Sequence, residues 1–153
     1  MEIALTYDRL GSRLRSIGGV PIEYDRLGSR PTSLGTWPLS YDHLGSRLVS
    51  IGTIPIAYDM LGSRPSVMGS WPLAYDHLGS RLTQIGPYEL TYDHLGSRVR
   101  NLGPLSISYD RLGSRASKVT LPPGQTALSS ELLLVLFFVL YEATLQRQRQ
   151  SAG

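Results

Sequence analysis

Hydrophobic and polar positions recur along most of the chain with a period of 17 residues. The period is marked by seven tyrosines, each followed by Asp-x-Leu-Gly-Ser-Arg: Tyr7, Tyr24, Tyr41, Tyr58, Tyr75, Tyr92 and Tyr109. A repeat unit this short cannot bury its apolar face alone and must stack on its neighbours. We therefore predict one tandem-repeat domain over residues 1–120.

Each unit predicts two short β-strands. Before the aspartate the chain alternates between apolar and polar side chains, as in Ile22-Glu23-Tyr24-Asp25, which is the period of a half-buried strand. A second segment follows, for example residues 46–51, and ends at a glycine. The tenth residue after each tyrosine is always aliphatic and is expected in the core: Ile17, Leu34, Ile51, Met68, Ile85, Leu102 and Val119.

The heptapeptide that recurs in every unit predicts the turn between the two strands of that unit. In the second unit the repeat-defining residues are Tyr24, Asp25, Leu27, Gly28 and Arg30. An aspartate that accepts backbone amides, followed three residues later by a glycine that tolerates positive φ, is typical of a type I turn with a G1 bulge. Each unit is therefore predicted to be a β-hairpin.

Two architectures remain open for seven such hairpins. In a solenoid each unit is one coil, and the seven aspartates and seven arginines form ladders of like charge. In a curled meander the sheet forms a spiral or closes on itself, and Tyr and Arg lie across from one another in an aromatic–guanidinium contact. We favour the meander because the turn signals are those of hairpins. The predicted fold class is an all-β tandem repeat of seven hairpins with one C-terminal α-helix.

Two units depart from the others in a correlated way. Pro31 and Pro65 follow the repeat arginine in the same units that carry Trp37 and Trp71, so we expect these units to form one exposed side. Trp37, Trp71 and Tyr88 occupy equivalent positions and are the candidate binding surface, as stacking platforms for a glycan or a peptide. Core packing is the competing interpretation of these aromatic residues.

The C-terminal segment has a different composition. Residues 121–130 include Leu121-Pro122-Pro123-Gly124 and predict a linker, and residues 131–153 predict an apolar helix with a basic polar tail. Ser129 or Ser130 is expected to cap the helix. Because the segment from Leu132 to Tyr141 is apolar without interruption, the helix must be buried. We expect it to cap the open end of the sheet or to mediate self-association, and membrane attachment is the alternative.

Charge and composition exclude several function classes. The net charge is +3, but seven aspartates and seven arginines occupy two fixed positions of the repeat and cancel, which argues against a nucleic-acid partner. The chain has no cysteine, so a disulfide framework and a thiol nucleophile are excluded. The N-terminal residues lack a basic segment followed by an apolar run, so cytoplasmic residence is expected.

Catalytic and metal chemistry is not expected. His43, His77 and His94 share one turn position, but the same position also carries Arg and Met, whereas a metal site needs three or four converging ligands. A serine follows each aspartate four residues later without a nucleophile elbow. An active site is a single asymmetric constellation, whereas this chain offers the same groups seven times. We therefore predict no catalytic residues, no cofactor and no metal.

The motif Tyr-Asp-x-Leu-Gly-Ser-Arg before an alternating strand resembles the tyrosine-aspartate (RHS) repeats of bacterial toxin shells and teneurins. The resemblance covers residues 3–120 and implies β-hairpins wound into a spiral shell. The period here is shorter, a serine separates the glycine from the arginine, and the protease-like terminal region of complete shells is missing. Enclosure of a cargo is therefore not carried over.

The expected function is a structural or protein-interaction scaffold, RHS-like in its hairpins, whose partner is another protein or a second copy of the chain. A multivalent carbohydrate-binding module is the first alternative. Membrane-associated assembly through the C-terminal helix is the second.

Overall fold

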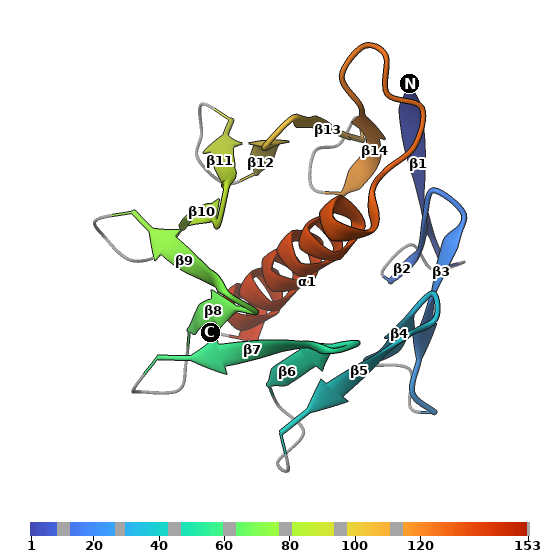
Figure 1. Cartoon of the computed structure of the whole chain (residues 1–153). Helices are drawn as coiled ribbons and strands as arrows, with labels where there is room; N and C mark the ends of the chain where they lie inside the picture. Colours follow the sequence, from blue (N-terminus) through green and yellow to red (C-terminus); the bar gives the residue numbers. More distant parts are fainter. Residues whose placement is uncertain are drawn as a thin grey trace.

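The computed structural model describes residues 1–8, 13–26, 30–42, 47–59, 64–76, 81–93, 98–110 and 115–152 (Figure 1). These residues form fourteen β-strands and one α-helix. In chain order the strands are β1 (Glu2–Tyr7), β2 (Leu14–Ile17), β3 (Val20–Tyr24), β4 (Pro31–Leu34), β5 (Trp37–Tyr41), β6 (Leu48–Ile51), β7 (Ile54–Tyr58), β8 (Pro65–Met68), β9 (Trp71–Tyr75), β10 (Leu82–Ile85), β11 (Tyr88–Tyr92), β12 (Val99–Leu102), β13 (Leu105–Tyr109) and β14 (Ala116–Thr120). The helix is α1 (Ser130–Ala152).

The strands form a closed antiparallel barrel. Each strand pairs with its neighbours in sequence, and β1 also pairs with β14, where Ile3 lies opposite Val119. The ring of strands surrounds the helix in Figure 1. The predicted hairpin meander is therefore confirmed in its closed form, and the solenoid alternative is wrong.

A β-bulge occurs in all seven of the hairpins that the Tyr-Asp motif connects. In the second hairpin Tyr24 lies opposite Pro31 but Glu23 lies opposite Ser33, so Thr32 is an extra residue on β4. The bulge brings Pro31 and Leu34 to the same face, although they are three residues apart, and both are buried. The turn predicted around Leu27 and Gly28 lies outside the described residues.

The opposite rim of the barrel is made of two-residue turns. In the first of them Gly18 and Gly19 both have positive φ, 55° and 86°, which matches a type I′ turn. In the next turn the positive φ, 60°, is confined to Gly35, as in type II′. These two turn types match the right-handed twist of a hairpin, so two-residue turns can recur along this rim of the barrel.

The core follows the predicted aliphatic column. All seven residues at the tenth position after tyrosine are at most 1% exposed. They belong to a single apolar cluster that also contains the buried residues of the helix.

The prediction that the Pro–Trp units form one exposed side is wrong. Pro31 and Pro65 are buried, and Trp37 and Trp71 are half-buried against the core.

Helix α1 lies inside the ring and does not cap a sheet edge. Its residues 134–139 are all buried, and Phe138 and Leu136 are fully enclosed. Side chains alone fill a barrel of about eight strands, whereas fourteen strands enclose a wider lumen that accommodates a helix about 10 Å across. Because the sheet closes on itself, it has no free edge to cap, which overturns that expectation.

The helix starts where the sequence predicts. The Ser129 hydroxyl accepts the Leu132 amide at 3.1 Å, so Ser129 is the N-cap. Across the described chain, α1 included, we find no helix with both the length and the apolar character needed to cross a membrane.

Candidate functional site

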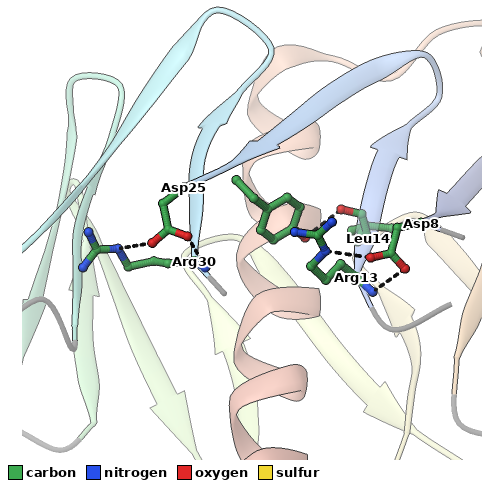
Figure 2. A network of polar contacts seen from close by, with 6 residues as sticks. Asp8, Arg13, Leu14, Asp25 and Arg30 are labelled. Atoms are coloured by element: carbon green, nitrogen blue, oxygen red, sulfur yellow. Dashed lines mark hydrogen bonds and ion pairs between the residues drawn. The ribbon is translucent and has the colours of Figure 1, made fainter. Parts of the chain in front are cut away.

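The repeated Tyr, Asp and Arg form one polar group at each hairpin loop. The Asp amide donates to the Arg carbonyl at 2.8–3.0 Å in all seven hairpins, which places the two side chains side by side. The Asp carboxylate then forms an ion pair with the Arg Nε atom, at 2.6 Å for Asp8 and Arg13 and at 3.7 Å for Asp25 and Arg30. Figure 2 shows these two pairs on adjacent hairpins.

The same arginine links its hairpin to the next one. The guanidinium of Arg13 lies over the ring of Tyr24, 4.7 Å from the centroid, and the other six arginines repeat this contact at 4.3–5.0 Å. The Tyr24 hydroxyl donates to the carbonyl of Leu14 at 2.7 Å. The predicted Tyr–Arg contact is confirmed, and its two residues come from neighbouring hairpins. We call each such set of Asp, Arg and following Tyr a junction.

The two ends of the repeat domain form the seventh junction. Arg115 lies 4.6 Å from the centroid of the Tyr7 ring, and the Tyr7 hydroxyl donates to the carbonyl of Ala116 at 2.6 Å. The same seam has an additional ion pair, between Lys118 and Glu2 at 3.1 Å. The closure of the ring therefore uses the same chemistry as its internal contacts.

Burial raises the pKa of five of the junction tyrosines. Desolvation, the largest effect, raises the pKa of Tyr24 and of Tyr92 to about 12. It also raises the pKa of Tyr41, Tyr58 and Tyr75, where a second contribution comes from the helix residues Tyr141 and Glu142. At neutral pH these phenols are hydrogen-bond donors.

The polar groups of the junctions bind one another and the backbone. Each carboxylate faces a guanidinium, and each phenol donates to a backbone carbonyl. In the part of the chain that the structure describes, no three His, Cys, Asp or Glu side chains gather closely enough to hold a metal ion. His43, His77 and His94 lie outside that part.

The predicted binding surface lies on the rim of two-residue turns. Trp37 packs on Gly52, and Trp71 meets Tyr88 edge-to-face with centroids 5.7 Å apart. All three aromatic residues are half-buried against the core, so the structure places them in packing contacts. Trp71 and Tyr88 are in direct contact, on consecutive units.

The polar contacts between the ring and α1 were not predicted. The Tyr88 hydroxyl donates to the Glu131 carboxylate at the start of the helix. Burial, followed by this hydrogen bond, raises the pKa of Tyr88 to about 12. In the sequence these contacts are indicated only by three polar residues in and around the apolar stretch, Glu131, Tyr141 and Glu142. Which residues of the ring they contact depends on where the helix lies, and the sequence does not show that.

These features define a closed barrel of seven hairpin repeats with an internal helix. No protein-family model, curated protein or solved structure matches the chain.

Proposed function

We propose that this protein is a structural scaffold whose outer face contacts another protein or a second copy of the chain. This proposal rests on the contacts that the repeated polar side chains make. At all seven junctions the Asp, Arg and Tyr side chains bind one another or the backbone of a neighbouring hairpin. Residues that a catalyst would direct at a substrate here hold the ring together.

The outer face of the barrel is divided in a way that supports a protein contact. The outward positions of the six strands β4–β9 carry no charged side chain: Thr32, Ser33, Pro38, Ser40, Val49, Ser50, Pro55, Ala57, Ser66, Val67, Pro72 and Ala74. Six of the remaining eight strands carry an outward charge, for example Glu89, Arg100 and Lys118, whereas β10 and β13 carry none. Depletion of charge is a feature of the centre of protein interfaces. We name these twelve positions the uncharged arc.

The apolar residues of α1 belong to the scaffold. Leu132 to Val139 lie in the lumen, where Leu133 is partly buried and the other residues are buried. The ring therefore already covers the apolar surface of this segment. The resemblance of the Tyr-Asp motif to tyrosine-aspartate repeats supports a hairpin scaffold of that general kind.

Site-specific photo-crosslinking of the full chain in its native cells tests this proposal. A benzoylphenylalanine at position 57, in the uncharged arc, is expected to give a discrete protein adduct. The same group at position 91, the equivalent repeat position on β11, is the matched control and is expected to give little. An adduct of twice 16.9 kDa identifies self-association, and a different mass identifies another protein. The absence of adducts from both positions would contradict the proposal.

A further inference from the structure

The first junction differs in charge from the other six. On the outer face, each junction has one bulge residue before the short turn and one residue preceding the next tyrosine. At the first junction these are Arg15 and Glu23, both charged. The corresponding pairs elsewhere are Thr32 and Ser40, Val49 and Ala57, Ser66 and Ala74, Thr83 and Thr91, Arg100 and Ser108, and Ser117 and Thr6.

The strands at this junction separate beyond the short turn, as they do at the other short hairpins, and a groove lies between them. The pairing of β2 with β3 extends over Ser16 opposite Pro21 and Ile17 opposite Val20. Beyond this pairing, towards the Tyr-Asp rim, lies a groove of about 340 Å³ whose polar lining is Asp8, Arg13, Arg15, Glu23, Tyr24 and Asp25. This volume is at the lower end of the range typical of small-molecule sites.

The charges that line the groove are of two kinds. Arg13 is held by Asp8 at 2.6 Å and by the ring of Tyr24, and Asp25 is paired with Arg30. These groups form the frame that every junction shares. Arg15 and Glu23 are exposed, and neither side chain has an ion-pair or hydrogen-bond partner among the residues that the structure describes. In the shared frame each aspartate is paired with an arginine, so the frame has no net charge. Arg15 and Glu23 therefore add one cation and one anion to the wall of the groove.

We propose that this groove binds a small zwitterionic ligand of about dipeptide size, with a carboxylate directed at Arg15 and an ammonium or guanidinium group directed at Glu23. A charge-assisted hydrogen bond to each free side chain would orient such a ligand across the separated strands. Because Arg15 and Glu23 are exposed to solvent, the expected Kd is on the order of 1 mM. The site is independent of the scaffold role and of the uncharged arc.

A titration of the isotope-labelled full chain, followed by amide chemical shifts, tests the proposal. The probe is acetyl-Lys-Glu-amide, whose only charges are one ammonium and one carboxylate. Singly charged comparators are acetyl-Lys-Gln-amide and acetyl-Gln-Glu-amide. We expect saturable shifts centred on residues 13–16 and 22–25 for the doubly charged probe, and at least threefold weaker binding for each comparator.

Two variants separate this site from the shared frame. Arg15→Thr combined with Glu23→Ser converts the first junction to the residues of the second, a combination that the fold already tolerates, and is expected to abolish saturation. Arg100→Thr removes the equivalent cation from the sixth junction and is expected to leave binding unchanged. Shifts that stay linear to about ten times the expected Kd, or that persist in the double variant, would overturn the proposal.

Discussion

Arg115 stacks on the ring of Tyr7 in the same way that Arg13 stacks on Tyr24. The guanidinium-to-centroid distances are 4.6 Å and 4.7 Å, although the first contact joins the two ends of the repeat domain and the second joins adjacent hairpins. The tyrosine hydroxyls bond equivalent carbonyls at both places. The seam is therefore an ordinary junction formed without a connecting loop.

This equivalence predicts equal losses for equivalent tyrosine substitutions. Tyr58→Phe and Tyr7→Phe each remove a hydroxyl that donates to a backbone carbonyl, at 2.7 Å and 2.6 Å. Each is expected to lower the free energy of unfolding by about 1 kcal/mol, because the carbonyl loses its partner in a partly buried place. Urea unfolding followed by circular dichroism measures both. A loss for Tyr58→Phe with none for Tyr7→Phe would show that the seam is open in solution.

The internal helix should contribute strongly to stability. Phe138→Ala removes a fully enclosed side chain from the lumen and is expected to cost about 3–5 kcal/mol, since the ring cannot collapse onto the space. Leu133→Ala on the same helix changes a half-buried side chain and is expected to cost about 1 kcal/mol. Equal costs, measured by the same urea unfolding, would contradict the placement of α1 inside the ring.

Replacement of Gly86, the glycine of the fifth short turn, is predicted to destabilise the fold. Gly86 has a φ of 53°, and a Cβ atom there would meet the Trp71 ring, with the Cδ1 atom at 2.6 Å. Gly86→Ala is expected to cost about 2–5 kcal/mol, the sum of left-handed strain and steric overlap. The control is Gly124→Ala, where φ is 89° but nothing lies within 4 Å of the added atom, and only the strain of about 1–2 kcal/mol is expected. Thermal unfolding of the two variants should rank them in this order.

Much of the local structure could be predicted from the sequence. The 17-residue period gave the hairpin unit, and the aliphatic tenth position correctly predicted residues such as Ile51 and Leu102 in the core. The contact of Arg with Tyr was also predictable, because the two residue types recur at fixed offsets. Each of these features is repeated seven times, so the pattern is readable without knowing how the units are placed in space.

The closure of the ring and the position of the helix could not be predicted. Closure depends on the angle between successive hairpins, and the bulge residue in each hairpin varies freely, from Arg15 to Val49 to Ser117. A helix that is apolar on all sides must be buried, but that requirement is met equally by a sheet edge, a second copy or a lumen. The Tyr88–Glu131 contact follows from that position and has no signature of its own in the sequence.

Alkaline pH is predicted to unfold the barrel. Tyr24 and Tyr92 have pKa values of about 12 in the folded chain against 10.0 in the unfolded chain. Because the folded-state pKa is raised, this contribution to stability is fully present below pH 10 and is lost as the pH rises through 12. Phenolate absorbance and far-ultraviolet circular dichroism should change together above pH 10. Ionisation of all tyrosines near pH 10, with the β-structure retained, would contradict the buried junctions.

A disulfide across the seam tests the closed ring most directly. Ala4 and Lys118 lie opposite each other on β1 and β14, at a spacing that a disulfide can bridge, and the chain has no other cysteine. The full chain with Ala4→Cys and Lys118→Cys is predicted to form an intramolecular disulfide on mild oxidation. The control pairs Ala4→Cys with Ser50→Cys, at the same repeat position as Lys118 but on β6, and should not form one. Failure of the first pair to cross-link, or cross-linking only between molecules, would contradict a barrel closed around its own helix.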